Sequence, residues 1–140
     1  MNQQRRSFCF LLTGLMAARS LSAGSAALRS KTYRFDDLPV RPDGENCFRP
    51  VLEGVTGSGC QIEMHETDLA PGGMPHAAHH HTHEEIFLVR EGTLEVTIAR
   101  RGAQLGPGSV AYVAAGEEHG IRNAGSTHAQ YLVVALGRKN

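Results

Sequence analysis

The 140-residue sequence has no tryptophan, only three cysteines and few aromatic residues, which make up 6% of the chain. It also has no excess of either charge, since 14 basic residues balance 14 acidic ones. Such neutrality gives no electrostatic basis for binding nucleic acid. The cysteines form no CxxC or Cys-His pattern, so they do not indicate a zinc or redox site. What is present, 41% hydrophobic residues and many glycines, is typical of a single globular domain.

The amino-terminal segment has the layout of an export signal. Arg5 and Arg6 precede an apolar run over residues 8–18, and small residues follow. This run is shorter than the ~20 residues that a membrane-spanning helix needs, and no later segment offers another, so we expect no permanent membrane span. The arginine pair resembles a twin-arginine address, which predicts that residues 1–27 are a signal peptide and that the protein is exported to a bacterial periplasm. An ordinary secretory signal or an uncleaved amphipathic tail is the alternative.

Removal of the signal changes the charge and the cysteine content of the chain. Without Arg5, Arg6 and Arg19, eleven basic residues face fourteen acidic ones, a net charge of −3. Cys47 and Cys60 remain, and an oxidising compartment would allow them to pair. Two cysteines thirteen positions apart are more often ordinary buried small residues, so we assign them no function.

Strand patterns dominate the sequence after the signal. Prolines and charges predict an extended lead-in over residues 28–47, followed by a β-barrel domain over residues 48–140. Apolar and polar residues then alternate with the period of two that a strand requires, and glycine-rich turns separate the segments, including an Arg-Arg-Gly turn at 100–102. Short strands with regular turns predict an all-β, antiparallel sandwich or barrel. The expected strands cover residues 60–65, 86–89, 94–98, 110–113, 119–122 and 130–136.

A histidine-rich tract, HHHTHEEIFLV, begins at residue 79. On an extended strand, His79, His81 and Glu85 share a face with the apolar residues that follow, while His80 and Glu84 face away. A further ligand should come from another strand, and His119 fits because it follows a tight turn and opens a strand. Three imidazoles and one carboxylate would suit a borderline divalent metal. The alternative is a solvated tract that binds metal loosely through its composition alone.

At these residues the chain resembles the cupin superfamily. The first cupin motif, G-x5-H-x-H-x3-E-x6-G, matches in every fixed position, and fifteen residues separate it from the second, G-x5-P-x-G-x2-H-x3-N. The second motif departs from the family pattern only at Ala114, where proline is usual, and this affects a turn rather than a ligand. The matching residues are Gly73, His79, His81, Glu85 and Gly92 in the first motif, and Gly108, Gly116, His119 and Asn123 in the second.

The resemblance implies a small single-domain cupin, an antiparallel jelly-roll barrel with a metal inside its mouth. It implies one divalent transition metal per chain, and imidazole with carboxylate suits Fe, Mn, Zn, Ni, Co or Cu without selecting one. His76, His80 and His83 lie outside the motifs, so we interpret them as rim or orienting groups. The metal ligands implied by the motifs are His79, His81, Glu85 and His119.

The resemblance also implies a function without naming a substrate. A metal-dependent enzyme acting on a small oxygenated organic molecule, of dioxygenase, decarboxylase or lyase, or isomerase type, is the first interpretation. The alternative is a cupin that binds a small ligand or metal without turnover. Apolar residues on both faces of the strand at 86–89 need cover from a second sheet of the same barrel or from a partner subunit, and the resemblance implies a homodimer through sheet edges. No catalytic residue can be named, because Tyr112, Arg122 and Tyr131 are expected to be packing or surface groups, and His65 and His128 ordinary surface or partly buried histidines.

Overall fold

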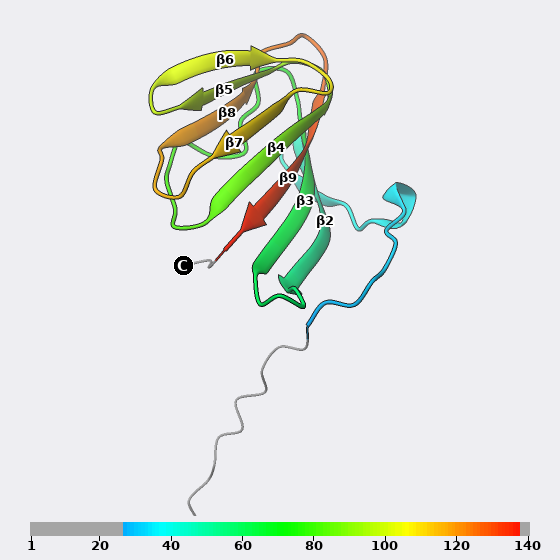
Figure 1. The fold of residues 1–140 in the computed structure, drawn as a ribbon. Helices are drawn as coiled ribbons and strands as arrows, with labels where there is room; N and C mark the ends of the chain where they lie inside the picture. The colour runs from blue at the N-terminus through cyan, green and yellow to red at the C-terminus, as the bar shows by residue number, and fades with distance from the viewer. Residues whose placement is uncertain (1–26, 138–140) are drawn as a thin grey trace, which may run out of the picture.

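The protein folds into two antiparallel β-sheets that enclose one core (Figure 1). The computed structural model describes residues 27–137. A six-stranded sheet has the order β1-β2-β3-β9-β4-β7, and a three-stranded sheet has the order β6-β5-β8. The elements are the 3-10 helix η1 (Phe35–Asp37) and the strands β1 (Arg41–Asp43), β2 (Asn46–Val55), β3 (Gln61–Leu69), β4 (Glu84–Glu91), β5 (Leu94–Ile98), β6 (Arg101–Leu105), β7 (Val110–Val113), β8 (His119–Asn123) and β9 (Ala129–Leu136).

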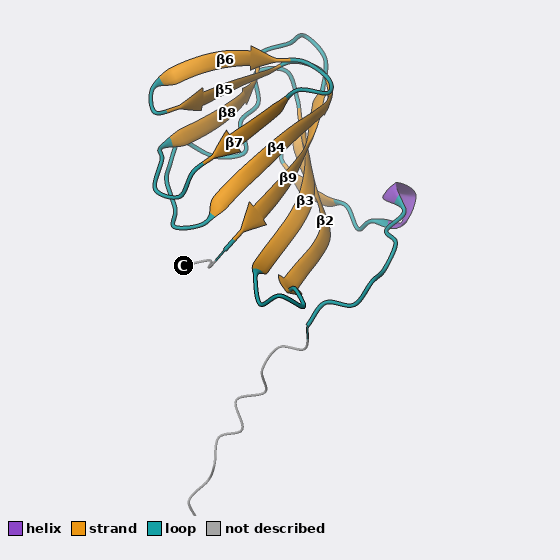
Figure 2. Ribbon diagram, in the orientation of Figure 1, coloured by secondary structure: helices purple, strands orange, loops and turns teal. Residues whose placement is uncertain are grey.

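Alternating side chains of both sheets fill the space between them, as the period-two patterns predict. Along β9 every second residue is buried, beginning with Ala129 and Tyr131. Figure 2 shows strands and loops with one short helical turn, so the all-β jelly-roll prediction is confirmed. The buried core cluster consists of Leu69, Phe87, Val89, Leu94, Val96, Ala111, Val113, Ile121, Ala129, Tyr131 and Val133.

Strand register lines up polar residues on the inner face of the larger sheet. Ala135 on β9 pairs with Glu63 on β3 on one side and with Glu85 on β4 on the other. One row further along, His65 on β3 pairs with Val133 on β9. Because side chains two residues apart point to the same face, His65 and Glu85 both face the interior of the barrel.

Two local predictions were wrong. The turn between β5 and β6 is not at residues 100–102: Ala99 and Arg100 take left-handed φ values of 46° and 65°, and β6 already begins at Arg101. Two successive positive φ values are those of a type I′ hairpin, for which Asn-Gly is the usual signal and Ala-Arg is not. In addition, β4 begins only at Glu84, so the histidine tract before it is a loop rather than an extended strand.

The lead-in is extended for most of its length but contributes more than expected to the fold. It contains the short strand β1, which pairs with the start of β2, and β2 begins at Asn46, inside the segment predicted as lead-in. The ring of the η1 residue Phe35 lies close to two guanidinium groups, with its centroid 5.0 Å from that of Arg49 and 4.8 Å from that of Arg90. Arg90 is also paired with the buried carboxylate of Glu66. The cation–π contacts thereby hold the lead-in against the sheet, and the ion pair, which lies within the sheet, fixes one of the two guanidinium groups.

Two motif positions are explained by packing. At Gly92, with φ of 74°, an added Cβ would lie 2.7 Å from the Cα of Ala129, so only glycine fits. Asn123 is 1% exposed, and its amide donates to the carbonyls of Leu69 at 2.9 Å and Thr127 at 2.7 Å. Its Oδ1 accepts the Gly125 amide at 2.9 Å. The asparagine thus holds the loop before β9 and the end of β3 together.

Several further predictions concern the outside of the fold. In the described part of the chain no helix is long and apolar enough to cross a membrane. The proposed signal peptide lies almost wholly outside the described residues.

Cys47 and Cys60 are free thiols, and Cys60 is exposed, which corrects the expectation that both are buried. On the edge strand β7, Val110 and Tyr112 are exposed by 57% and 54%. The homodimer through sheet edges stays a prediction.

Replacement of Asn123 should weaken the fold. Asn123→Ala leaves buried carbonyls without donors, and we expect the free energy of unfolding to fall by about 2–4 kcal/mol. Urea denaturation measures this change. Ser126→Ala, in the same loop and exposed, is the control. A value for Asn123→Ala within about 0.5 kcal/mol of the wild type would contradict the role of this side chain.

Candidate metal centre

A pair of backbone hydrogen bonds joins the two motifs. The amide of His79 donates to the carbonyl of His119 at 3.0 Å, and the amide of His119 donates back to His79 at 2.8 Å. This antiparallel bridge continues the ladder of the smaller sheet beyond β8. The amide of Gly116 also donates to the carbonyl of His81 at 2.8 Å. The loop that carries the histidines is therefore held by backbone contacts, although it is not a strand.

These contacts bring the predicted side chains together. The ring centroid of His119 lies 4.7 Å from that of His79 and 4.9 Å from that of His81. One nitrogen of each ring lies within 4.8 Å of the others. Glu85, on β4 of the larger sheet, lies beside two of these rings, those of His81 and His119. His80 and Glu84 are exposed and face away, as predicted.

The tautomers of two rings follow from their hydrogen bonds. Nδ1 of His81 lies 2.9 Å from the carbonyl oxygen of His83, and Nδ1 of His119 lies 2.9 Å from that of Glu117. Because a carbonyl oxygen only accepts, each Nδ1 must carry a proton and donate it. In the neutral rings, Nε2 then presents a lone pair. A backbone carbonyl on the far nitrogen is the usual partner of a metal-ligating histidine.

The bare nitrogens face a carboxylate. Nε2 of His81 lies 3.3 Å from Oε1 of Glu85, and Nε2 of His119 lies 3.2 Å from Oε2. Both nitrogens are buried, and neither has a hydrogen-bond partner within residues 27–137. Nδ1 of His79 is likewise buried and has no partner among these residues. Lone pairs that face carboxylate oxygens repel one another unless a cation lies between them. Ligand atoms about 2.1 Å from one ion are about 3.0–3.4 Å apart at right or tetrahedral angles, so these residues fit a divalent metal.

The cluster has little contact with solvent. His119 is 2% exposed, and the side chains of His81 and Glu85 are each 14% exposed. Burial is the main cause that lowers the pKa of His79, and the neighbouring imidazoles of His76 and His119 add to it. Neutral imidazole is the form that binds metal.

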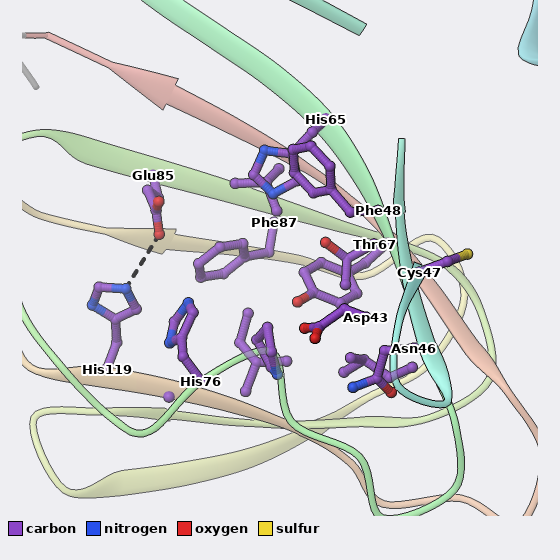
Figure 3. Close-up of a pocket in the computed structure, with 16 residues that line it drawn as sticks. Asp43, Asn46, Cys47, Phe48, His65, Thr67, His76, Glu85, Phe87 and His119 are labelled. Carbon is purple, nitrogen blue, oxygen red and sulfur yellow. Dashed lines mark ion pairs between the residues drawn. The ribbon is translucent and has the colours of Figure 1, made fainter. Parts of the chain in front are cut away.

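A cavity of about 330 Å³ adjoins this cluster. In Figure 3 the cluster residues Glu85 and His119 lie at one end, Phe87 lies between, and Asp43, Asn46 and Cys47 lie at the other end. The far end belongs to β1, β2 and the turn between them, which form part of the wall of the barrel mouth. Apolar side chains make up much of the lining, including Phe48, Leu69, Phe87, Ile121 and Val133.

Comparison with known families agrees with this geometry. The cupin domain profile matches residues 65–135, which is just over half of the chain. The chain belongs to the cupin family. No curated protein sequence matches it.

Solved cupin-like structures share the fold. KdgF from a Halomonas species has a TM-score of 0.70 at 14% identity, covering 80% of this chain and 97% of that one. An RmlC-like cupin from Shewanella frigidimarina has a TM-score of 0.66 at 14% identity, covering 82% and 95%. The polyketide cyclase RemF from Streptomyces resistomycificus also has 0.66, at 22% identity, covering 79% and 82%. At these identities the likeness shows the fold alone.

The cupin cavity is lined by polar residues to which the sequence analysis assigned no functional role. His65 lines it, and its Nδ1 lies 3.2 Å from Oε1 of Glu63. Burial lowers the pKa of His65 to about 4, although Glu85 acts in the opposite direction. Tyr131 also lines the cavity, where burial raises the pKa of its hydroxyl, which is hydrogen-bonded to Thr67.

The other polar residues considered in the sequence analysis, Tyr112, Arg122 and His128, do not line this cupin cavity. Tyr112 is exposed, and Arg122 is an exposed partner of Glu95. His128 is mostly exposed and pairs with Asp68 at 2.6 Å. His65 points inward because it shares the parity of the buried residues Thr67 and Leu69 on β3, whereas the alternation after residue 60 grouped it with the polar residues Gln61 and Glu63. What the sequence does not indicate is that this stretch faces the histidine loop.

His65 should make the fold sensitive to acid. Its pKa in the folded state, about 4, lies below the ordinary value of 6.5, so the unfolded chain binds more protons between these values. Stability is therefore lost as the pH falls from 6.5 to 4, by on the order of 3 kcal/mol from this group. Urea denaturation of chelator-treated protein across this range should show a smaller loss for His65→Gln than for wild type. The exposed control His128→Gln should follow the wild type, and parallel curves for His65→Gln and wild type would contradict the prediction.

Proposed function

We propose that this cupin binds one divalent transition metal through His79, His81, Glu85 and His119. The observation that supports it is the convergence of Nε2 lone pairs on a carboxylate in a buried site. A loosely binding surface tract would leave its rings hydrated, whereas here backbone carbonyls orient two of the far nitrogens. The metal, when bound, supplies a Lewis acid that polarises a ligand oxygen. Its identity is left open by the ligand types.

We propose further that the protein is a metal-dependent enzyme rather than a passive binder. Bare apolar walls would suit a binder, but polar groups other than the candidate ligands, among them His65, Thr67 and Tyr131, also line the cavity. His65 is held by the Glu63 carboxylate and is neutral above its lowered pKa, so it can accept a proton from a bound molecule. The Tyr131 hydroxyl keeps its proton and can donate a hydrogen bond. Dioxygenase, decarboxylase or lyase, and isomerase chemistry all fit these groups.

The charge of the cavity narrows the substrate class. Among the described lining residues the charged side chains are the carboxylates of Asp43 and Glu85, with no lysine or arginine. With one divalent ion bound, the charges of the ion and of the two carboxylates sum to zero, so a multiply anionic molecule would find no net positive charge and no guanidinium or ammonium partner in the cavity. The proposed substrate is therefore neutral or singly ionised, mostly apolar, and carries an oxygen that can reach the metal. Phe48 and Phe87 would pack against its apolar body.

Metal binding is tested by loading and ligand removal. The full-length chain, stripped with chelator and reloaded separately with each candidate ion, should retain one equivalent after desalting, measured by elemental analysis. His119→Ala should lose more affinity than the 10–100-fold typical of an orienting partner, because it removes a ligand. His128→Ala, an exposed histidine away from the cluster, is the matched control. Equal retention by His119→Ala and wild type would refute the ligand set.

Substrate class is tested with a matched pair of probes. Cobalt-loaded protein should bind 4-nitrophenol at least about tenfold more tightly than 4-nitrophenyl phosphate, because only the ester brings a dianion to the cavity. Visible absorption of the cobalt ion follows the titration. Equal or tighter binding of the phosphate ester would contradict the substrate class.

Turnover separates the two functional classes. Iron-loaded protein is screened with hydroxylated aromatic and enolic compounds while oxygen uptake is recorded. Uptake indicates a dioxygenase, and turnover without uptake indicates a lyase or isomerase. Compounds that bind the loaded site and are recovered unchanged favour the non-catalytic alternative.

A further inference from the structure

His83 contacts two of the four proposed ligands, although it belongs to neither motif. Its ring stacks on that of His81, with centroids 3.5 Å apart and planes inclined by 8°. Its Nε2 lies 3.3 Å from Oε1 of Glu85. Its backbone carbonyl accepts the Nδ1 proton of His81 at 2.9 Å. One residue of the loop thus touches ligands that come from the loop and from β4.

The ring of His83 has a defined tautomer. Nδ1 is buried and has no hydrogen-bond partner in the described part of the chain, whereas Nε2 faces a carboxylate oxygen. A carboxylate only accepts, so the proton lies on Nε2 and is donated to Glu85. The side chain is 13% exposed, and Glu63, Ala135 and Gly137 line the crevice beside it. With little water to compete, this hydrogen bond fixes the carboxylate.

The contact decides how Glu85 is oriented. With Oε1 engaged by His83, the other oxygen, Oε2, is directed to Nε2 of His119 at 3.2 Å. We propose that His83 is a positioning residue of the metal centre: its Nε2–H holds Glu85 so that the carboxylate meets the imidazoles of His81 and His119. This inference rests on the proposed metal-binding function.

Two substitutions separate hydrogen bonding from stacking. His83→Phe keeps a ring against His81 but lacks the donor, whereas His83→Gln keeps an N–H at a similar reach but lacks the ring. Cobalt affinity of the full-length protein is measured by competition with a chromophoric chelator. We expect His83→Phe to weaken binding by about 10–100-fold and His83→Gln to stay within about threefold of the wild type. The visible spectrum of the bound cobalt should change only in His83→Phe, since its carboxylate ligand is no longer fixed.

The controls distinguish failure of this inference from failure of the proposed function. His80→Phe makes the same change at an exposed histidine of the same loop and should bind cobalt as the wild type does. Circular dichroism and urea denaturation verify that each variant is folded. If wild type and His80→Phe both fail to bind, the metal function itself is wrong. If the wild type binds and His83→Phe matches it, or His83→Gln loses as much as His83→Phe, the positioning role is overturned while the metal site stands.

Discussion

The candidate centre depends on the two backbone hydrogen bonds between His79 and His119. Forty residues separate them in sequence, and His79 belongs to a loop that would otherwise have no regular pairing. Because the bridge extends the ladder of β8, the position of His79 is set by the smaller sheet, while Glu85 belongs to the larger one. The cluster therefore joins the two sheets at the mouth of the barrel. Strands on both sides hold the nitrogen lone pairs and the carboxylate oxygens close together. Their mutual repulsion would push them apart if the supporting backbone were mobile.

The rest of the fold holds the candidate ligands in fixed orientations. Nitrogen lone pairs and carboxylate oxygens face each other with little solvent, which is unfavourable for an isolated chain. Backbone carbonyls fix the tautomers, and His83 fixes the carboxylate, so the groups cannot relax by simple rotation. An arrangement of this kind is expected where a functional site departs from what stability alone would favour.

Sequence reasoning located most strands because their period and their turns agree. It missed β6 because Arg101–Leu105 has no clear alternation and the Ala-Arg turn carries no glycine. It did not delimit β2, where Pro50 argues against a strand; a register shift between Pro50 and Leu52 accommodates the proline. The rings of His79, His81 and His119 lie together, with Glu85 beside two of them, but through a loop bridge rather than through the parity of one strand.

The environment of the site was less predictable. The role of His83 depends on ring stacking, and that of His65 on strand register, and neither leaves a pattern in the local sequence. The lining by Asp43 and Asn46 depends on the β1–β2 turn meeting the barrel mouth, a contact between segments with no shared motif. Long-range packing decides these features, which is why composition and spacing did not reveal them.

The two ends of the cavity are formed by different parts of the sequence, because the β1–β2 segment supplies one of them. Its cluster end comes from residues 79–119, inside the region that matches the cupin domain, whereas its far wall comes from residues 43–48, before that region begins. The proposed ligands and the opposite wall of the cavity thus lie in separate stretches of the sequence. Under the proposed function, exchange or mutation of the β1–β2 hairpin would alter which molecules fit the cavity without changing the proposed ligands, so relatives with the same motifs would not need to share a substrate.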